Sequence, residues 1–245
     1  MFPYKDDNPT LRTPYVTLLL IGLNAAVWVL IQGMGTEPRL SASICELGLI
    51  PGEVLGRLPV GTPVSMGPFP CQTGSPTAWF SPVTSMFMHG GWLHLIGNLW
   101  FLWVFGNNVE DSMGRLRFLL FYLATGILAA GTQAAINPDS AIPMVGASGA
   151  ISGVMGAYIV LYPRVRVHML VFLGIFITRI AVPAFLMLGY WFLLQLIGGV
   201  PALARESGGV AFWAHAGGFA AGMLLVFLFR NPALIRERML HRLPA

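Results

Sequence analysis

Two reactive side chains lie in apolar sequence, where reactive side chains are rare. Ser148 and His215 each fall within an uncharged stretch long enough to cross a bilayer, and each has small neighbours: Ala147 and Gly149 flank the serine, and Ala216 follows the histidine. A polar side chain in hydrocarbon is costly and is usually there for a function. A serine nucleophile and a histidine base placed in this way indicate hydrolysis inside a membrane.

The composition indicates a polytopic membrane protein. Of the 245 residues, 56% are hydrophobic and only 10% are charged, so the chain is too apolar to leave its whole surface in water. Five uncharged stretches reach the roughly 20 residues that a spanning helix needs, and we place a sixth span from about residue 93 to residue 107. The five stretches are 13–36, 118–138, 140–163, 180–204 and 207–229. A further apolar stretch, 167–178, is too short to span and is expected to be a connector or the entry to the fifth span.

The distribution of basic residues sets the predicted orientation. With six spans and a cytoplasmic amino terminus, only Arg39, Arg57 and Arg205 of the 14 Lys and Arg residues lie outside. Cytoplasmic loops are enriched in Lys and Arg, so both termini are predicted to be cytoplasmic. The net charge of +4 then reflects topology, and no nucleic-acid partner is expected. The basic segment 230–242 is expected to contact anionic membrane lipids.

These predictions divide the chain into three parts. Residues 1–15 form a short cytoplasmic N-terminus, 16–229 form a six-helix transmembrane catalytic domain with a long outer loop at 37–80, and 230–245 form a basic cytoplasmic tail. The first 14 residues include Asp6 and Asp7 and do not resemble a cleavable presequence. We therefore expect a multi-pass protein of a prokaryotic plasma membrane, with an organellar membrane as the alternative.

Four polar residues are predicted to lie at one depth, because spans two, four and six all begin on the outer side. His94 and Asn98 lie in the first turns of span two. Ser148 lies near the start of span four, and His215 lies near the start of span six. At 1.5 Å per residue, all four lie within about 10 Å of the outer surface. Their convergence indicates a shared site.

Small residues would let the helices that carry Ser148 and His215 approach closely. They recur on one face of each helix, at Gly149, Gly153 and Gly156 in span four and at Gly218 and Gly222 in span six. His94 and Asn98, four residues apart, share one face of span two. The predicted spans contain no Asp or Glu, so the expected catalytic group is a Ser-His dyad without a buried acid.

Each of these residues also has a structural interpretation. Ser148 beside glycines could be a packing residue, and His215 could be a structural hydrogen-bonding group. Their shared depth with Asn98 favours catalysis. His89, His94 and His215 could suggest a metal site, but no acid or cysteine lies near them in the spans, so we expect neither a metal nor a cofactor.

Three segments resemble the signature blocks of the rhomboid intramembrane serine proteases. They are His89-Gly90-Gly91-Trp92-Leu93-His94-Leu95-Ile96-Gly97-Asn98, Gly146-Ala147-Ser148-Gly149, and Ala214-His215-Ala216-Gly217-Gly218 with Gly222. The resemblance covers roughly residues 83–229 and implies an all-α polytopic membrane protein, a six-transmembrane-helix rhomboid-like bundle. It implies Ser148 as the nucleophile and His215 as the general base and then acid. Asn98, His94 and the backbone N–H of Ser148 would stabilise the oxyanion, and His89 is expected to be structural.

The resemblance further implies a serine endopeptidase that cuts single-pass transmembrane proteins in or near the outer ends of their transmembrane segments. Targets with Gly, Ala, Ser or Pro there unwind more easily, which exposes the carbonyl group that is attacked. They would enter past a mobile fifth span and the loop 198–209. The alternative is a catalytically inactive rhomboid-like protein that binds transmembrane helices. A channel is disfavoured, because it would need polar residues along its full depth.

Two questions stay open. Some rhomboids have a Tyr four residues after the nucleophile, stacked under the catalytic ring, whereas this chain has Ser152. The group that orients His215 is therefore not identified. Cys45 and Cys71 both lie in the outer loop, on the oxidising side of a bacterial plasma membrane. They either form a disulfide or remain two free thiols.

Overall fold

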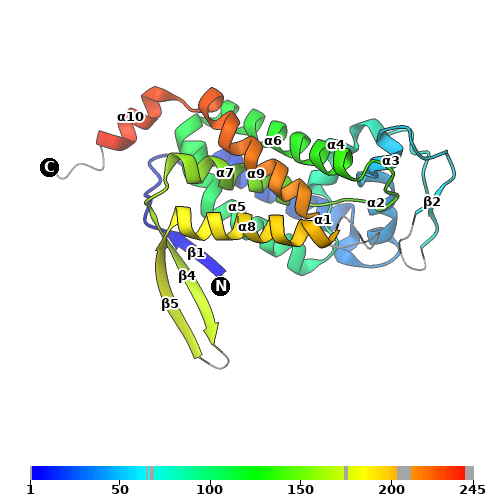
Figure 1. Cartoon of the computed structure of the whole chain (residues 1–245), viewed down its shortest axis with the longest axis horizontal. Coiled ribbons are helices and arrows are strands. Elements are labelled where there is room, and N and C mark those ends of the chain that lie inside the picture. Colours follow the sequence, from blue (N-terminus) through cyan, green and yellow to red (C-terminus); the bar gives the residue numbers. More distant parts are fainter. Residues whose placement is uncertain (1, 65, 67–68, 174–175, 203–210, 241–245) are drawn as a thin grey trace.

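Long helices packed side by side form the body of the molecule (Figure 1). The computed structural model describes residues 2–64, 66, 69–173, 176–202 and 211–240. Within these ranges, six helices have 14 or more residues: α1 (Tyr15–Leu30), α5 (Trp92–Met113), α6 (Arg115–Ile136), α7 (Ser148–Leu161), α8 (Ala184–Ala202) and α9 (Phe212–Phe229). Most of the predicted entry loop, 198–209, and the end of the predicted tail, 241–245, lie outside the described residues.

Three of the helices are long and apolar enough to cross a membrane, namely α6, α8 over Ala184–Pro201, and α9. The helices α1 and α7 are apolar but shorter. The helix α7 begins later than the predicted stretch 140–163, because Pro143 and the positive φ of Gly146 (124°) interrupt helical geometry before Ser148. Six spans and two cytoplasmic termini therefore remain predictions.

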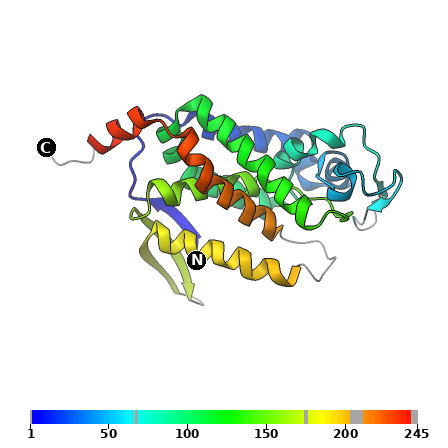
Figure 2. The ribbon, with the colours of Figure 1, turned by 45° about the horizontal axis from the view of Figure 1, so that its top comes forward.

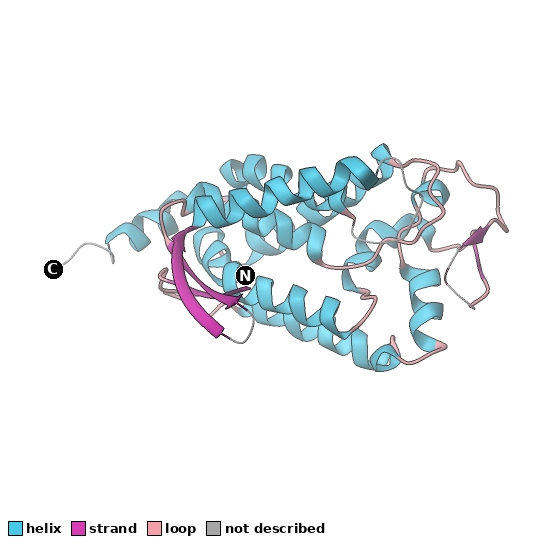
Figure 3. Ribbon diagram, turned by 60° about the horizontal axis from the view of Figure 1, so that its bottom comes forward, coloured by secondary structure: helices cyan, strands magenta, loops and turns pink. Residues whose placement is uncertain are grey.

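The prediction of an all-α chain is wrong in two places, although the chain is mostly helical. Strands β1 (Phe2–Asp6), β4 (Arg166–Leu173) and β5 (Phe176–Pro183) form an antiparallel sheet in the order β1-β4-β5. The β4–β5 hairpin, where a connector was expected, projects away from the helices (Figure 3). Its β-branched residues, such as Val167, Ile177 and Ile180, favour strands over a helix. The fifth helix consequently begins at Ala184 and not at Ile180.

The second departure lies in the long loop after α1. This region folds into short elements: the 3-10 helices η1 (Gly33–Gly35), η2 (Ala78–Phe80) and η3 (Ser85–Phe87), the helices α2 (Arg39–Leu47), α3 (Pro51–Val54) and α4 (Ser81–Thr84), and the strands β2 (Pro63–Val64) and β3 (Cys71–Gln72). A disulfide between Cys45 and Cys71 joins α2 to β3. Figure 2 shows this region at the end of the bundle opposite to α10 (Pro232–Leu240).

Helices α7 and α9 are in direct backbone contact. A Cβ atom built at Gly222 of α9 would lie 1.9 Å from the carbonyl oxygen of Gly153 on α7. A Cβ atom at Gly218 would lie 2.2 Å from the carbonyl oxygen of Gly149. Both distances are far below any van der Waals contact, so only glycine fits at these two positions of α9. The predicted small-residue contact between spans four and six is therefore present, and it fixes how closely the two helices approach.

At the other end of the bundle, a set of polar residues, here called the terminal cluster, joins the N-terminal segment to α5 and α10, and all of them but Arg12 are buried. It consists of Asn8, Arg12, Asn108, Asp111 and Arg238. The buried Arg238 guanidinium forms an ion pair with Asp111 and donates to the Oδ1 atoms of Asn108 (2.8 Å) and Asn8 (3.0 Å). Arg12 contacts the other oxygen of Asp111 at 3.3 Å. These bonds compensate for the burial of charge.

Next to this cluster, Glu110 of α5 caps the start of α1. Its carboxylate accepts hydrogen bonds from the backbone N–H groups of Val16 (3.0 Å) and Thr17 (2.8 Å). The first N–H groups of a helix have no acceptor within the helix, and a negative charge there is favourable. Glu110 is buried, and its bonds thus set the position of α1 against α5.

We expect Gly222→Ala to destabilise the protein by about 1 to 3 kcal/mol, because the added methyl group overlaps backbone atoms of α7 that no side-chain rotation can move. The matched control is Gly131→Ala on α6, where an added Cβ would meet no atom within 4 Å. Thermal unfolding of both purified variants in detergent measures the difference. Equal stability of the two variants would contradict the backbone contact.

Candidate active site

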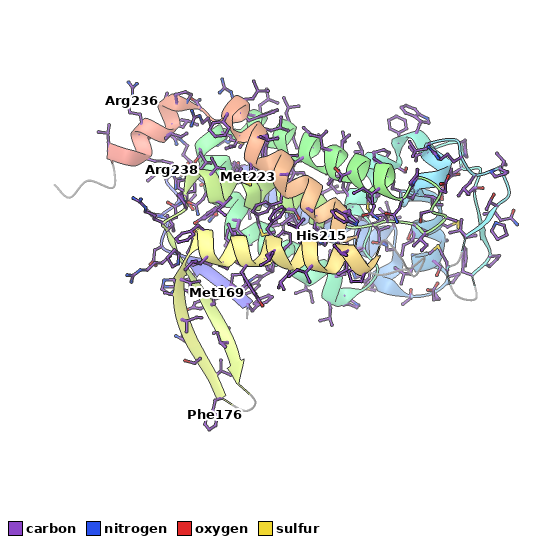
Figure 4. The ribbon with its side chains drawn as sticks, viewed as in Figure 1. Met169, Phe176, His215, Met223, Arg236 and Arg238 are labelled. Atoms are coloured by element: carbon purple, nitrogen blue, oxygen red, sulfur yellow. A yellow bond between two sulfur atoms is a disulfide. The ribbon has the colours of Figure 1, made fainter. Side chains whose placement is uncertain are left out.

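The candidate residues lie at the starts of three helices. Ser148 is the first residue of α7, His94 is the third residue of α5, and His215 is the fourth residue of α9. Figure 4 shows His215 beside α8, toward the end of the bundle that carries the disulfide region, whereas Arg238 lies at the opposite end. The predicted convergence of these residues from distant parts of the chain is present in the structure.

Ser148 and His215 are within hydrogen-bonding distance. The Nε2 atom of His215 lies 2.8 Å from Oγ of Ser148, and its Nδ1 atom lies 2.9 Å from Oε1 of Gln195 on α8. The Gln195 oxygen can only accept, so Nδ1 carries the proton of the neutral ring. The Nε2 lone pair is then free to accept the proton of the Ser148 hydroxyl. This arrangement is the one that a general base requires.

A second set of groups faces the serine from α5. The backbone N–H of Gly90 donates to Nδ1 of His94 (3.3 Å), so the neutral His94 ring carries its proton on Nε2. The Nδ2 atom of Asn98 is a buried donor without a hydrogen-bond partner among the described residues. A Cβ built at Gly146 would lie 2.6 Å from His94 Nε2 and 3.5 Å from Asn98 Nδ2. Both donors therefore face the backbone two residues before Ser148.

The position of Ser148 adds a third donor. As the first residue of α7, it has a backbone N–H that no acceptor within the helix can reach. The start of a helix also carries a partial positive charge, which favours an anion. Together with His94 and Asn98, this N–H could stabilise negative charge that develops on an oxygen beside the serine.

A small cavity borders the serine. Its walls consist mainly of small and apolar residues: Ser85, Met86, Gly126, Ala129, Ala130, Met144, Val145, Gly146, Ser148, Gly149, Ala150, Ala211 and Ala214. The cavity offers space for a short apolar side chain next to the Ser148 hydroxyl. Ser85 and Ser148 supply its polar side chains, and no charged residue lines it, so it suits a short uncharged side chain.

His89 lies behind His94 and is fully buried. Its backbone N–H and carbonyl group both bond to the Gln32 side chain, at 2.8 Å each. Its ring meets the His94 ring edge to face, with centroids 5.2 Å apart. Burial lowers the pKa of His89 to about 3. His89 is thus a neutral ring that packs against His94, and its structural role stays a prediction.

Sequence reasoning missed the side chains that contact the His215 ring. Ser152 does not support the ring, because its hydroxyl donates to the Ser148 carbonyl of its own helix (2.6 Å). Instead, Gln195 bonds to Nδ1, and the Trp191 ring lies 5.9 Å from the imidazole, centroid to centroid. The available signal was Gln195 itself, the one amide side chain in the apolar sequence of α8.

Metal ligands do not gather at this site or elsewhere in the part of the chain that the structure describes: it contains no group of three or more His, Cys, Asp or Glu side chains placed to hold an ion. The disulfide uses both cysteines. The prediction that the protein needs no metal or cofactor remains a prediction.

The chain is a helical protein with helices apolar and long enough to cross a membrane, and a serine–histidine pair lies near the starts of α7 and α9. The family model of the rhomboid domain matches residues 76–232 of the sequence, and the chain therefore belongs to the rhomboid family. Rhomboid proteins are embedded in membranes, and this chain shares that location.

Curated relatives include proteases and proteins named only as rhomboid-like. Rhomboid-like protein 11, chloroplastic, of Arabidopsis thaliana is 43% identical over 76 residues, covering 31% of this chain and 27% of that protein. Rhomboid protease GluP of Bacillus subtilis is 37% identical over 119 residues, 49% of this chain and 22% of that protein. Rhomboid-type serine protease 2 of Emericella nidulans is 30% identical over 171 residues, 67% of this chain and 30% of that protein. The matches thus span less than a third of the length of each of these three relatives.

We expect the burial of His89 to make stability depend on pH. Its pKa is about 3 in the folded protein and about 6.5 when unfolded. The unfolded chain therefore binds the proton more readily, and stability falls as pH drops below about 6.5. When the pH falls from 7 to 4.5, the free energy of unfolding should fall by about 2 kcal/mol more in the wild type than in His89→Phe. Unfolding in detergent at the two pH values measures this, and parallel losses in both proteins would contradict it.

Proposed function

We propose that this protein is an intramembrane serine endopeptidase with a Ser148–His215 dyad. The observation that carries the proposal is the 2.8 Å contact between Ser148 Oγ and His215 Nε2, with the other ring nitrogen bonded to an acceptor. A structural hydrogen bond alone would not require the unpartnered donor that Asn98 Nδ2 presents to the segment before the serine. The family membership and the relatives named as proteases support the same function.

The proposed reaction begins when His215 Nε2 takes the hydroxyl proton of Ser148 as Oγ attacks a peptide carbonyl carbon. The carbonyl oxygen becomes an oxyanion, which Asn98, His94 and the Ser148 backbone N–H stabilise. The protonated imidazole then gives its proton to the leaving amine, and the C–N bond breaks. Water, activated by the same imidazole, hydrolyses the acyl-enzyme and restores the serine.

The proposed substrates are single-pass transmembrane proteins, cut in or near the outer ends of their transmembrane segments. The small apolar cavity beside Ser148 suits a short side chain at the scissile bond. A substrate helix hides its carbonyl groups in hydrogen bonds, so helix-weakening residues such as Gly and Pro should favour cleavage.

We also propose six spans, with both termini on the cytoplasmic side and membrane lipids around the helices. The distribution of Lys and Arg supports this orientation. The kind of membrane is a prediction that the relatives leave open, since they include bacterial, chloroplast and mitochondrial proteins.

We expect both Ser148→Ala and His215→Ala to abolish cleavage without unfolding the protein. Each variant removes a group that makes or breaks bonds, whereas the backbone contact between α7 and α9 is unchanged. The measurement uses purified protein in liposomes with a single-pass substrate that has small residues near its outer end, and products are identified by mass. Wild-type turnover in either variant would refute the dyad. Absence of cleavage by the wild type across several substrates, with no labelling of Ser148 by a fluorophosphonate, would favour an inactive protein that binds helices.

We expect Asn98→Ala to lower kcat by about 10² to 10³, the usual loss for one oxyanion donor. The matched control is Asn107→Ala, which removes the same amide from the far end of α5, where it bonds to Thr10 (3.1 Å). Steady-state kinetics with the same substrate compare the two variants. A loss in Asn107→Ala as large as that in Asn98→Ala would show that the effect comes from helix α5 as a whole and not from the donor.

A further inference from the structure

We propose that Gln195 of α8 is a positioning residue that fixes the tautomer and orientation of the His215 ring. The inference rests on the proposed function and answers the question that Ser152 leaves open. The contact that carries it is the 2.9 Å hydrogen bond between Gln195 Oε1 and His215 Nδ1. Gln195 touches neither the serine nor the space beside it, so it acts through the histidine.

The orientation of the Gln195 amide follows from its second bond. Its Nε2 atom donates to the backbone carbonyl of Trp191, one turn earlier on α8 (3.2 Å). A carbonyl oxygen can only accept, so the amide nitrogen must face Trp191 and the amide oxygen must face His215. An acceptor at Nδ1 selects the tautomer with its proton there. The remaining nitrogen, Nε2, is the one that faces Ser148.

Gln195 also suits its surroundings. It is buried, with 8% of its surface exposed, in a helix that is otherwise almost entirely apolar. A carboxylate at this position would carry the desolvation cost of a charge, whereas a neutral amide supplies an acceptor at a lower cost. The amide thus takes the orienting part that an aspartate has in a Ser-His-Asp triad, without adding charge to an apolar site.

The rest of α8 holds the same histidine in place. The Trp191 ring lies against the imidazole at an interplanar angle of 36°, and the Phe192 ring stacks on Phe219 of α9 with centroids 4.8 Å apart. Near the end of α8, the Gly199 carbonyl accepts a bond from the Trp213 indole (3.1 Å). The histidine is therefore oriented by α8, although it belongs to α9. A shift of α8 by an ångström or two would break the Gln195 bond and free the ring.

The experiment compares four variants with the wild type in liposomes. Gln195→Met and Gln195→Leu remove the acceptor with little change in volume, Gln195→Glu keeps an acceptor oxygen, and Leu194→Ala changes the half-exposed neighbour on the same helix. The measurements are kcat and KM for a single-pass substrate, the rate at which a fluorophosphonate labels Ser148, and the thermal unfolding temperature.

We expect kcat and the labelling rate to fall roughly 10-fold in the Met and Leu variants, with KM within about twofold of the wild type. The Glu variant should keep at least half of the wild-type kcat, and Leu194→Ala should match the wild type. Unchanged kcat in a folded Met or Leu variant, or an equal loss in the Glu variant, would overturn the role of Gln195.

Nitrogen-15 spectra of ring-labelled histidine separate this proposal from the function on which it rests. The His215 signal, assigned by its loss in His215→Ala, should show protonated Nδ1 in the wild type and a mixture of tautomers in Gln195→Met. A wild type that neither cleaves nor labels would overturn the proposed protease, and the spectra would still decide whether Gln195 sets the tautomer. Identical His215 spectra in both proteins would overturn the positioning role alone.

Discussion

The backbone contact between α7 and α9 is the constraint on which the site depends. In a membrane, lipid chains are as apolar as the helices, so close packing must hold helices together in place of the hydrophobic effect. At Gly222 this packing reaches the limit, because a Cβ atom there would overlap the backbone of Gly153. Ser148 and His215 lie one to two turns from this contact, and their separation is therefore fixed by main-chain atoms.

The other parts of the site are positioned through side chains. The donors of α5 face α7 across Gly146, where a single added carbon atom would collide with His94. The imidazole of His215 is supported by side chains of α8, through one hydrogen bond and one aromatic contact. Distance within the dyad is thus set by backbone packing, whereas the orientation of the base is set by side chains on a neighbouring helix. The two properties respond to different substitutions.

The sequence allowed the meeting of Ser148 with His215, and of His94 and Asn98 with the segment before Ser148, to be predicted, because uncharged stretches and helical rise together indicate a similar depth for all four. It did not allow the β4–β5 hairpin to be predicted, since a short apolar run fits a strand as well as a helix. Gln195 was missed although it is the one amide in α8, because it carries no charge and the stretch 180–204 therefore stays uncharged. Its role depends on how α8 packs against α9, and the local sequence of α8 does not predict that packing.

The terminal cluster has a consequence for how the chain is assembled. Asp111 lies at the end of α5, and its buried partner Arg238 is synthesised 127 residues later. Asn8 is made much earlier still, yet it meets Arg238 only after the last long helix has left the ribosome. Closure of this end of the bundle is consequently a late event of biogenesis, and a chain that stops short of α10 keeps a buried carboxylate without its buried counter-charge.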